Sequence, residues 1–195
     1  MTAVSPGLAT LPRSGRRAGA VVVALGAGAL LARPMLVRAV AHPTAMLAML
    51  FVGLGLAGLC WPLDPAATTA AMTTPLAVLA VGVGALLAGR LIAAGTAAAA
   101  VPPPLAPLLL NGLAAVAEEA FFRRLLYGLL APRGTTVAVV GSAACFAAVH
   151  VTVWGFGVLP LDLAAGLLFG WQRAATGRWA VPTCTHVVAN VLAVL

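Results

Sequence analysis

The segment Ala117–Arg124 reads AEEAFFRR and places two of the chain's four acidic residues side by side between apolar stretches. A carboxylate in the middle of a bilayer costs about 2.5–3.5 kcal/mol on insertion scales, so packing alone does not explain two adjacent ones. Ionisable residues inside a membrane indicate a functional site, and they need partners. The sequence offers Arg123, His150 and His186 as partners, and we interpret the remaining chain as the scaffold that brings them together.

The composition indicates a membrane protein. Of the 195 residues, 63% are hydrophobic and 8% are charged, whereas a soluble domain averages about 25% charged residues. The mean hydropathy of +1.10 predicts a polytopic membrane protein of one domain. The net charge of +7 comes from arginine alone. Because these arginines lie at the ends of apolar segments, they indicate membrane topology and contact with a lipid bilayer, and no binding of nucleic acid.

Apolar segments close to the length that crosses a bilayer, roughly 17–25 residues, recur along the chain. We predict an all-α, polytopic transmembrane helical bundle of about seven spans. The spans are expected at residues 18–33, 44–61, 75–95, 105–130, 135–153, 156–173 and 179–195. The first extends to about residue 40 if the helix only kinks at Pro34. Residues 1–17 are expected to be a disordered cytoplasmic N-terminus, and residues 18–195 the transmembrane domain.

The distribution of arginine favours a cytoplasmic N-terminus. In this orientation the arginines on or towards the cytoplasmic side are Arg13, Arg16, Arg17, Arg123, Arg124, Arg133, Arg173 and Arg178. Those on the other side are Arg33, Arg38 and Arg90. The segment Ser14–Arg17 also resembles a twin-arginine export signal, but no small-residue cleavage site follows the apolar run. The composition is typical of a bacterial protein, so we expect an integral protein of the bacterial inner membrane.

The helical spacing of the acidic pair predicts two different roles. Arg123 follows Glu119 by four residues, which places the guanidinium one turn from the carboxylate and predicts an ion pair. Glu118 points about 100° away from Glu119, so both can border one cavity. Glu118 is then free to act as a general base or acid. A purely structural ion pair between helices is the alternative, although one glutamate would suffice for it.

Two histidine motifs lie on later spans at a similar depth. His150 ends the run FAAVH, and His186 precedes Asn190 by four residues on one face of the last span. Each motif alone is as typical of a core histidine or of a helix–helix hydrogen bond. At a rise of about 1.5 Å per residue, however, these side chains and Glu118 lie at overlapping depths near the middle of the membrane. We therefore predict that they share one polar cavity.

Other polar or reactive residues are not assigned to this site. His42 and Asp64 lie near prolines in expected loops, and Asp162 follows Pro160 where it can cap a helix. The cysteines form no CxxC pair and are interpreted as small buried hydrophobic residues, namely Cys60, Cys145 and Cys184.

Three motifs on separate spans together point to one family. They read Glu118-Glu119-x-x-x-Arg123, Phe146-x-x-x-His150 and His186-x-x-x-Asn190. This pattern resembles the CPBP family, which groups type II CAAX prenyl proteases with bacterial relatives linked to bacteriocin processing or self-immunity. The segment 166–170, which reads GLLFG, and the following Thr176-Gly177 are also similar to the family's sequence before its last motif. The resemblance covers about residues 105–195. The chain differs from the prenyl proteases in length, because about seven spans are expected here and eight are expected in those proteins.

The resemblance implies hydrolysis of a peptide bond inside the membrane. It implies that Glu118 activates a water molecule, that His150 positions this water, and that His186 and Asn190 stabilise the oxyanion. The Glu119–Arg123 pair would orient the helix. The implied enzyme is an intramembrane protease, a CAAX protease-like hydrolase.

Metal dependence is left open by the sequence. A carboxylate with His150 and His186 has the ligand types of a catalytic zinc site, and the family is commonly labelled metalloprotease. The chain has no HExxH helix, and a metal-free mechanism needs only Glu118 and His150 around a water. A divalent metal such as zinc and a metal-free water are therefore alternatives, and the sequence slightly favours the second.

The expected function is that of an intramembrane endopeptidase acting on a membrane-associated peptide or protein. Nothing in the sequence indicates that this substrate is prenylated. The alternative is a non-catalytic membrane protein, such as an immunity factor, a scaffold or a small transporter, that uses the polar cluster to bind a partner or an ion.

Overall fold

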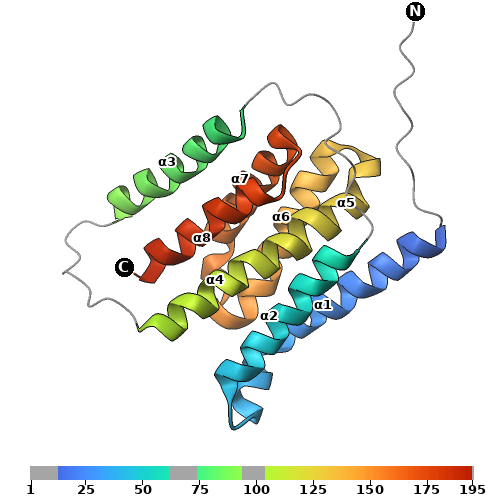
Figure 1. The fold of residues 1–195 in the computed structure, drawn as a ribbon, viewed down its shortest axis with the longest axis vertical. Coiled ribbons are helices and arrows are strands. Elements are labelled where there is room, and N and C mark those ends of the chain that lie inside the picture. Colours follow the sequence, from blue (N-terminus) through green and yellow to red (C-terminus); the bar gives the residue numbers. More distant parts are fainter. Residues whose placement is uncertain (1–12, 62–73, 94–103, 195) are drawn as a thin grey trace, which may run out of the picture.

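The fold is that of a computed structural model, which describes residues 13–61, 74–93 and 104–194. Every regular element in these ranges is helical, which confirms the expected all-α fold class (Figure 1). The elements are α1 Arg13–Ala39, α2 Pro43–Cys60, α3 Pro75–Ala93, α4 Leu105–Glu119, the π-helix η1 Ala120–Leu126, α5 Tyr127–Leu130, the 3₁₀-helix η2 Ala131–Arg133, α6 Thr135–Trp154, the 3₁₀-helix η3 Phe156–Val158, α7 Leu159–Thr176 and α8 Ala180–Val194.

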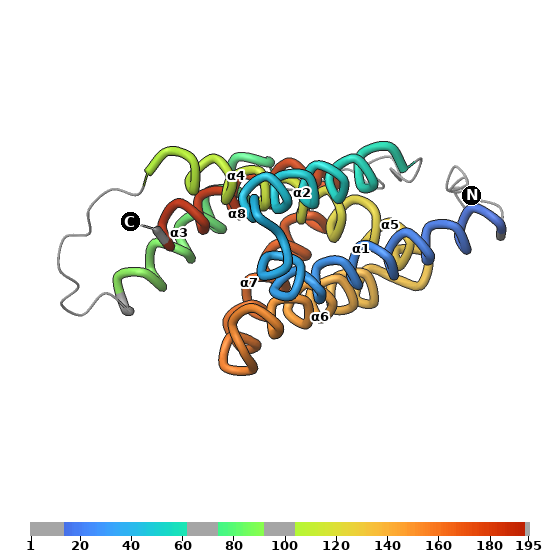
Figure 2. The backbone as a smooth tube through the Cα atoms, turned by 90° about the horizontal axis from the view of Figure 1, so that it is seen from below, coloured from blue at the N-terminus to red at the C-terminus, as the bar shows by residue number. Residues whose placement is uncertain are grey.

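The continuous helical segment formed by α4, η1 and α5 lies at the centre of the bundle. Figure 1 shows α4 between α2 and α8, with α3 beyond α8. Figure 2 shows α1, α6 and α7 in a second layer, in which α6 contacts both α1 and α7. The segment that carries the acidic pair is therefore covered by helices from both layers.

The expected spans correspond to the helical segments, with ends shifted by a few residues. By length and composition, the helices able to cross a membrane are Ser14–Ala39, Pro43–Cys60, Leu105–Arg133 and Thr135–Trp154. The apolar helices α3 and α8 are shorter, and α7 carries Gln172 and Arg173 buried inside the bundle. The fold is thus that of an integral membrane protein, in which the described residues form four long apolar helices and three that are shorter or more polar.

Helix α1 is longer than the first expected span. It begins at Arg13, so residues 13–17, expected to be disordered, are helical, and residues 1–12 lie outside the described part of the chain. It also continues through Pro34 to Ala39, which agrees with the alternative expectation that the first span extends to about residue 40. The early start has a simple cause, because arginine is a good helix former and the adjoining apolar run propagates the helix.

Aromatic side chains from three helices fill the centre of the core. Phe121 and Phe122 of η1 are fully buried. Phe122 contacts Phe146 of α6 edge-on, and Phe146 contacts Phe169 of α7 in the same way, with ring centroids 5.5 and 6.2 Å apart. Such pairs contribute about 0.5–1.5 kcal/mol each beyond the area that they bury. This cluster holds η1 against α6 and α7.

Glycines let the helices approach closely at two places. A Cβ on Gly166 would lie 3.0 Å from the Cα of Ala143, so α7 packs directly on α6. Gly166 and Gly170 form a GxxxG pair, a pattern that lets membrane helices pack closely. A Cβ on Gly58 would collide with the main chain of Ala120. Helix α2 therefore needs a glycine where it crosses the start of η1.

Some arginines that entered the topology count stabilise the fold instead. Arg123 and Arg173 are buried, and Nε of Arg173 donates a hydrogen bond to the carbonyl of Arg123. Arg124 donates to the carbonyls of Gly58 and Trp61, which lie at the end of α2, where carbonyl groups lack helical partners. Without the two buried arginines, the count of eight against three becomes six against three, so it favours the same orientation less strongly.

The cysteines are not buried as expected. Cys60, Cys145 and Cys184 are all exposed on the surface of the bundle. The surface of a membrane bundle faces lipid, which is as apolar as a protein core. A small apolar side chain is therefore accommodated equally well in either place, and burial does not follow from residue type.

Candidate active site

A π-helix follows directly after the acidic pair. Glu118 and Glu119 are the last residues of α4, and η1 begins at Ala120. π-helices are rare and occur frequently at functional sites. The wider turn changes the direction in which the following side chains point, relative to a regular α-helix. The sequence of residues 105–130 gives no signal for this change, because its apolar pattern is that of one continuous helix.

Glu119 is the inner carboxylate and is paired on two sides. Its Oε1 lies 3.3 Å from Nη1 of Arg123 and 3.0 Å from Nδ1 of His186. The side chains of Glu119 and Arg123 are fully buried. Nη2 of Arg123 also donates to the carbonyl of Gly166 at 3.2 Å, and its guanidinium lies 4.5 Å from the ring centroid of Phe146. The ion pair expected from the i, i+4 spacing is present, and it links α4 to α7 and α8.

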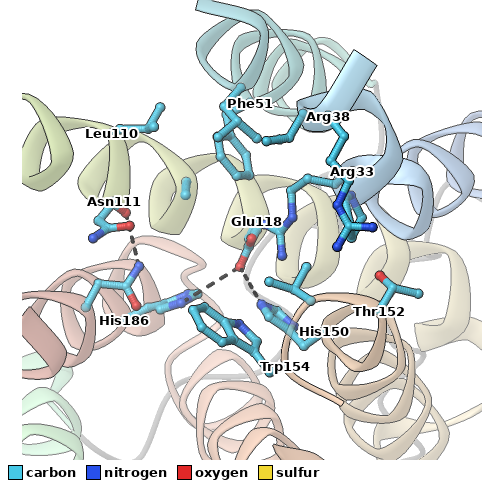
Figure 3. Close-up of a pocket in the computed structure, with 16 residues that line it drawn as sticks. Arg33, Arg38, Phe51, Leu110, Asn111, Glu118, His150, Thr152, Trp154 and His186 are labelled. Atoms are coloured by element: carbon cyan, nitrogen blue, oxygen red, sulfur yellow. Dashed lines mark hydrogen bonds and ion pairs between the residues drawn. The ribbon is translucent and has the colours of Figure 1, made fainter. Parts of the chain in front are cut away.

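Glu118 is the outer carboxylate and faces two imidazoles (Figure 3). Its Oε2 lies 3.8 Å from Nε2 of His150 and 3.9 Å from Nε2 of His186. These separations are too long for direct hydrogen bonds, and they suit polar groups that are bridged by one water molecule. The side chains come from α4, α6 and α8, so three segments far apart in the sequence meet at one carboxylate oxygen.

The orientation of His150 is fixed by groups behind it. Its Nδ1 lies 2.8 Å from the carbonyl oxygen of Phe146, which can only accept a hydrogen bond, so Nδ1 is the donor. In the neutral ring, Nε2 then carries the lone pair on the side of Glu118. Oδ2 of Asp162 lies 3.8 Å from the same Nδ1 and has no hydrogen-bond partner within the described chain.

Sequence reasoning placed Asp162 at a helix cap and outside the site. The structure instead places it beside His150, with 16% of its side chain exposed. The rule that marked Glu118, a charge within an apolar segment, applied to Asp162 as well. Asp162 was not assigned to the site because it follows Pro160, and an acidic residue in the first turn of a helix is explained by its favourable interaction with the helix dipole.

Asn190 lines a cavity shared with Glu118 and both histidines, of about 450 Å³. This volume is within the range of small-molecule sites. Nδ2 of Asn190 donates to the main-chain carbonyl of Asn111 at 3.0 Å, and its second N–H has no acceptor among the described residues. The other polar and aromatic residues that line the cavity include Arg33, Arg38, Phe51, Asn111, Thr152 and Trp154 (Figure 3).

The residues predicted for the site thus occupy two layers. Glu118, His150, His186 and Asn190 line the cavity, while the Glu119–Arg123 pair lies behind it. Exposed His42 lines a separate surface hollow, and Asp64 lies outside the described residues. The lining residues Arg33, Arg38 and Asn111 were not predicted. No motif connects them to the histidines, and the two arginines were interpreted only as topology signals.

The donor atoms do not fit a metal ion in their present arrangement. Among residues 13–61, 74–93 and 104–194, no group of three or more His, Cys, Asp or Glu side chains is arranged to hold one. The nearest set is Glu118, His150 and His186. Zinc bonds of about 2.0–2.2 Å in a tetrahedral site place neighbouring donors roughly 3.3–3.6 Å apart. The 3.8 and 3.9 Å separations found here are wider, so we assign no step to a metal.

The fold and the site together define a bundle of membrane helices around a buried glutamate–histidine cluster. Residues 99–192 match the family described as type II CAAX prenyl endopeptidase, Rce1-like. This range includes all three motifs, and the match supports the resemblance to the CAAX protease family found in the sequence. The matched family is one of proteases that work in a lipid environment. Comparison with curated proteins and with solved structures gives no significant match.

Proposed function

We propose that the chain is an intramembrane endopeptidase in which Glu118 activates a water molecule for attack on a peptide bond. One observation carries this proposal. Oε2 of Glu118 lies at nearly equal distances, 3.8 and 3.9 Å, from Nε2 of His150 and of His186 at the wall of the cavity. A water molecule held between these atoms has a proton acceptor beside it and open volume in front of it, where a substrate carbonyl can lie.

In the proposed reaction, Glu118 accepts a proton from the water as its oxygen bonds to the carbonyl carbon. Nε2 of His150 accepts the second hydrogen of the water and so directs the attacking lone pair. The carbonyl oxygen becomes an oxyanion, which the second N–H of Asn190 and the imidazole of His186 stabilise. Glu118 then delivers its proton to the amide nitrogen as the C–N bond breaks, which restores the carboxylate.

Three further groups support this reaction without touching the substrate. Glu119 accepts the hydrogen bond from Nδ1 of His186 and so keeps Nε2 directed at the cavity. Arg123 balances the charge of Glu119 in the fully buried interior. We propose Asp162 as a further positioning residue, because its Oδ2 faces Nδ1 of His150 and has no other partner within the described chain.

The proposed substrate is a membrane-anchored or amphipathic peptide or protein. Apolar side chains such as Phe51, Leu110 and Trp154 share the cavity wall with the polar cluster, which suits a peptide segment with apolar side chains. We also propose that the N-terminus is cytoplasmic and that the protein resides in a bacterial inner membrane. The remaining arginine asymmetry supports this orientation.

The proposal is tested with purified protein in detergent and a library of amphipathic peptides, whose cleavage is followed by mass spectrometry. Glu118→Gln keeps the size of the side chain but removes the proton acceptor, so cleavage should slow by about 10²–10⁴-fold. A chelator should leave the rate unchanged, because no step uses a metal. Folding of both proteins is checked in parallel by tryptophan fluorescence.

Two results would contradict the proposal in different ways. Turnover like that of the wild type in a folded Glu118→Gln protein would exclude Glu118 as the base but would leave the chain a protease. Absence of cleavage by the wild type at every pH, together with peptide binding that Glu118→Gln weakens, would instead indicate a non-catalytic binding protein.

A further inference from the structure

The cavity contains two arginines that the proposed reaction does not use. Arg33 and Arg38 lie on the C-terminal part of α1 and line the cavity together with Glu118. In Figure 3 both side chains lie on the side of Glu118 away from Asn111 and His186. The cavity therefore combines the glutamate–histidine cluster with two positive charges.

These two charges have no partner among the residues that the structure describes. The buried arginines of the bundle are bonded to a carboxylate or to main-chain carbonyls. By contrast, no ion pair or hydrogen bond joins Arg33 or Arg38 to any residue of the described ranges. The guanidinium of Arg33 instead lies 6.0 Å from the ring centroid of Phe51, a buried residue of α2.

Unpaired guanidinium groups on a partly apolar wall attract an anion. Arginine forms short, charge-assisted and often bidentate hydrogen bonds with carboxylates, and it stacks on aromatic rings at the same time. Phe51 lines the cavity as well, so its contact with Arg33 orients this guanidinium towards the cavity. An anionic ligand there would meet a preformed cationic wall.

Building on the proposed function, we propose that Arg33 and Arg38 bind a carboxylate of the peptide substrate. This carboxylate is the C-terminal group of the peptide or an acidic side chain near the scissile bond. A lipid phosphate is the competing occupant, because arginines near helix ends often extend to the headgroups. The peptide is favoured because both arginines line the cavity that contains Glu118, and because Arg33 contacts a buried ring on the neighbouring helix.

The test uses four peptides of one sequence, which carry a free or amidated C-terminus and an internal Glu or Gln. The variants are Arg33→Gln, Arg38→Gln and the control Arg90→Gln, which removes an exposed arginine of α3 that does not line the cavity. Each cavity variant should lower kcat/KM for the acidic peptide by roughly tenfold, mainly through KM, and should change the neutral peptide less than about twofold. The control Arg90→Gln should have the same kcat/KM as the wild type for each of the four peptides.

The comparison among the peptides identifies which carboxylate is bound, because only its removal should reproduce the effect of the arginine substitutions. Arg33→Lys keeps the positive charge and should retain part of the preference for the acidic peptide. Equal losses on acidic and neutral peptides would overturn the inference. A loss that occurs in phosphatidylglycerol vesicles but is absent from phosphatidylcholine vesicles would overturn it too, and would assign the arginines to lipid headgroups.

The same set of proteins separates this inference from the proposed function. Cleavage by the wild type with no preference between acidic and neutral peptides would overturn the inference and leave the protease intact. If the wild type cleaves none of the peptides, binding of their fluorescent forms decides the matter. Tighter binding of the acidic peptide that is lost in Arg33→Gln would support the subsite, whereas equal binding of all peptides would overturn it.

Discussion

Arg123→Met removes the positive charge that faces Glu119 inside the bundle. The two side chains are fully buried, with Nη1 and Oε1 3.3 Å apart. Methionine is unbranched and adaptable, so it fills much of the vacated space and the variant reports mainly the loss of charge. The change also removes the donor that lies 3.2 Å from the carbonyl of Gly166 and the guanidinium that lies 4.5 Å from the ring centroid of Phe146.

The expected loss of stability follows from these contacts. Removing one partner of a buried ion pair costs about 3–5 kcal/mol, because the other charge stays buried without compensation. An unsatisfied carbonyl costs about 1–3 kcal/mol. These costs overlap, and His186 still contacts Oε1 of Glu119 at 3.0 Å, so we expect a total of about 4 kcal/mol. Such a loss is a large part of the 5–15 kcal/mol that stabilises a typical protein.

The assay is denaturant-induced unfolding in detergent, followed by the fluorescence of the chain's 4 tryptophans. Arg90→Met is the matched control, because Arg90 is exposed, and it should change stability by less than about 0.5 kcal/mol. Adding Glu119→Gln to Arg123→Met should recover most of the loss, since no uncompensated charge then remains. The reasoning is refuted if Arg123→Met unfolds together with the control, or if the double variant is no more stable than Arg123→Met alone.

Two further predictions concern catalysis. Asn190→Ala should lower kcat by about 10²–10³-fold, because it removes one oxyanion donor. The loss of kcat in the double variant Glu118→Gln/Asn190→Ala should be smaller than the product of the two single losses. If the two losses multiply in the cleavage assay, the residues act on separate steps. Asp162→Asn should lower kcat by roughly 10–100-fold, as for other residues that orient a functional histidine, with KM unchanged. Because Oδ2 of Asp162 has no hydrogen-bond partner to lose within the described chain, the thermal stability of the Asp162→Asn variant in detergent should equal that of the wild type. A change in KM alone would contradict the positioning role.

The glutamate–histidine cluster was predictable because the membrane restricts where charge can lie. Glu118, His150 and His186 sit in apolar segments, where a charge that faces lipid is costly. Each therefore has to face the inside of the bundle, and their similar depths left few ways to arrange them. The pair Glu119–Arg123 was more predictable still, since a spacing of four residues brings two side chains together on an α-helix.

Other features of the site depend on contacts that the sequence does not encode locally. The π-helix that begins at Ala120 lies where the main chain of α2 crosses at Gly58. The apolar pattern of the sequence does not predict it. The place of Asp162 beside His150 depends on how closely α7 packs on α6, which Gly166 allows. The cysteines, judged from residue type alone, were expected in the wrong place, because lipid and core are equally apolar environments.

The sequence by itself determined which side chains had to be inside the bundle and at what depth, because both follow from the cost of charge in lipid and from the rise of a helix. It also indicated the family resemblance, since the motifs are short patterns in the sequence itself. Only the tertiary structure decided which oxygen of the acidic pair faces the cavity. It alone placed Arg33 and Arg38 on the wall of that cavity. The physical reason is that the rotation of a helix about its axis is set by its neighbours, whereas its depth in the membrane is set by its own residues.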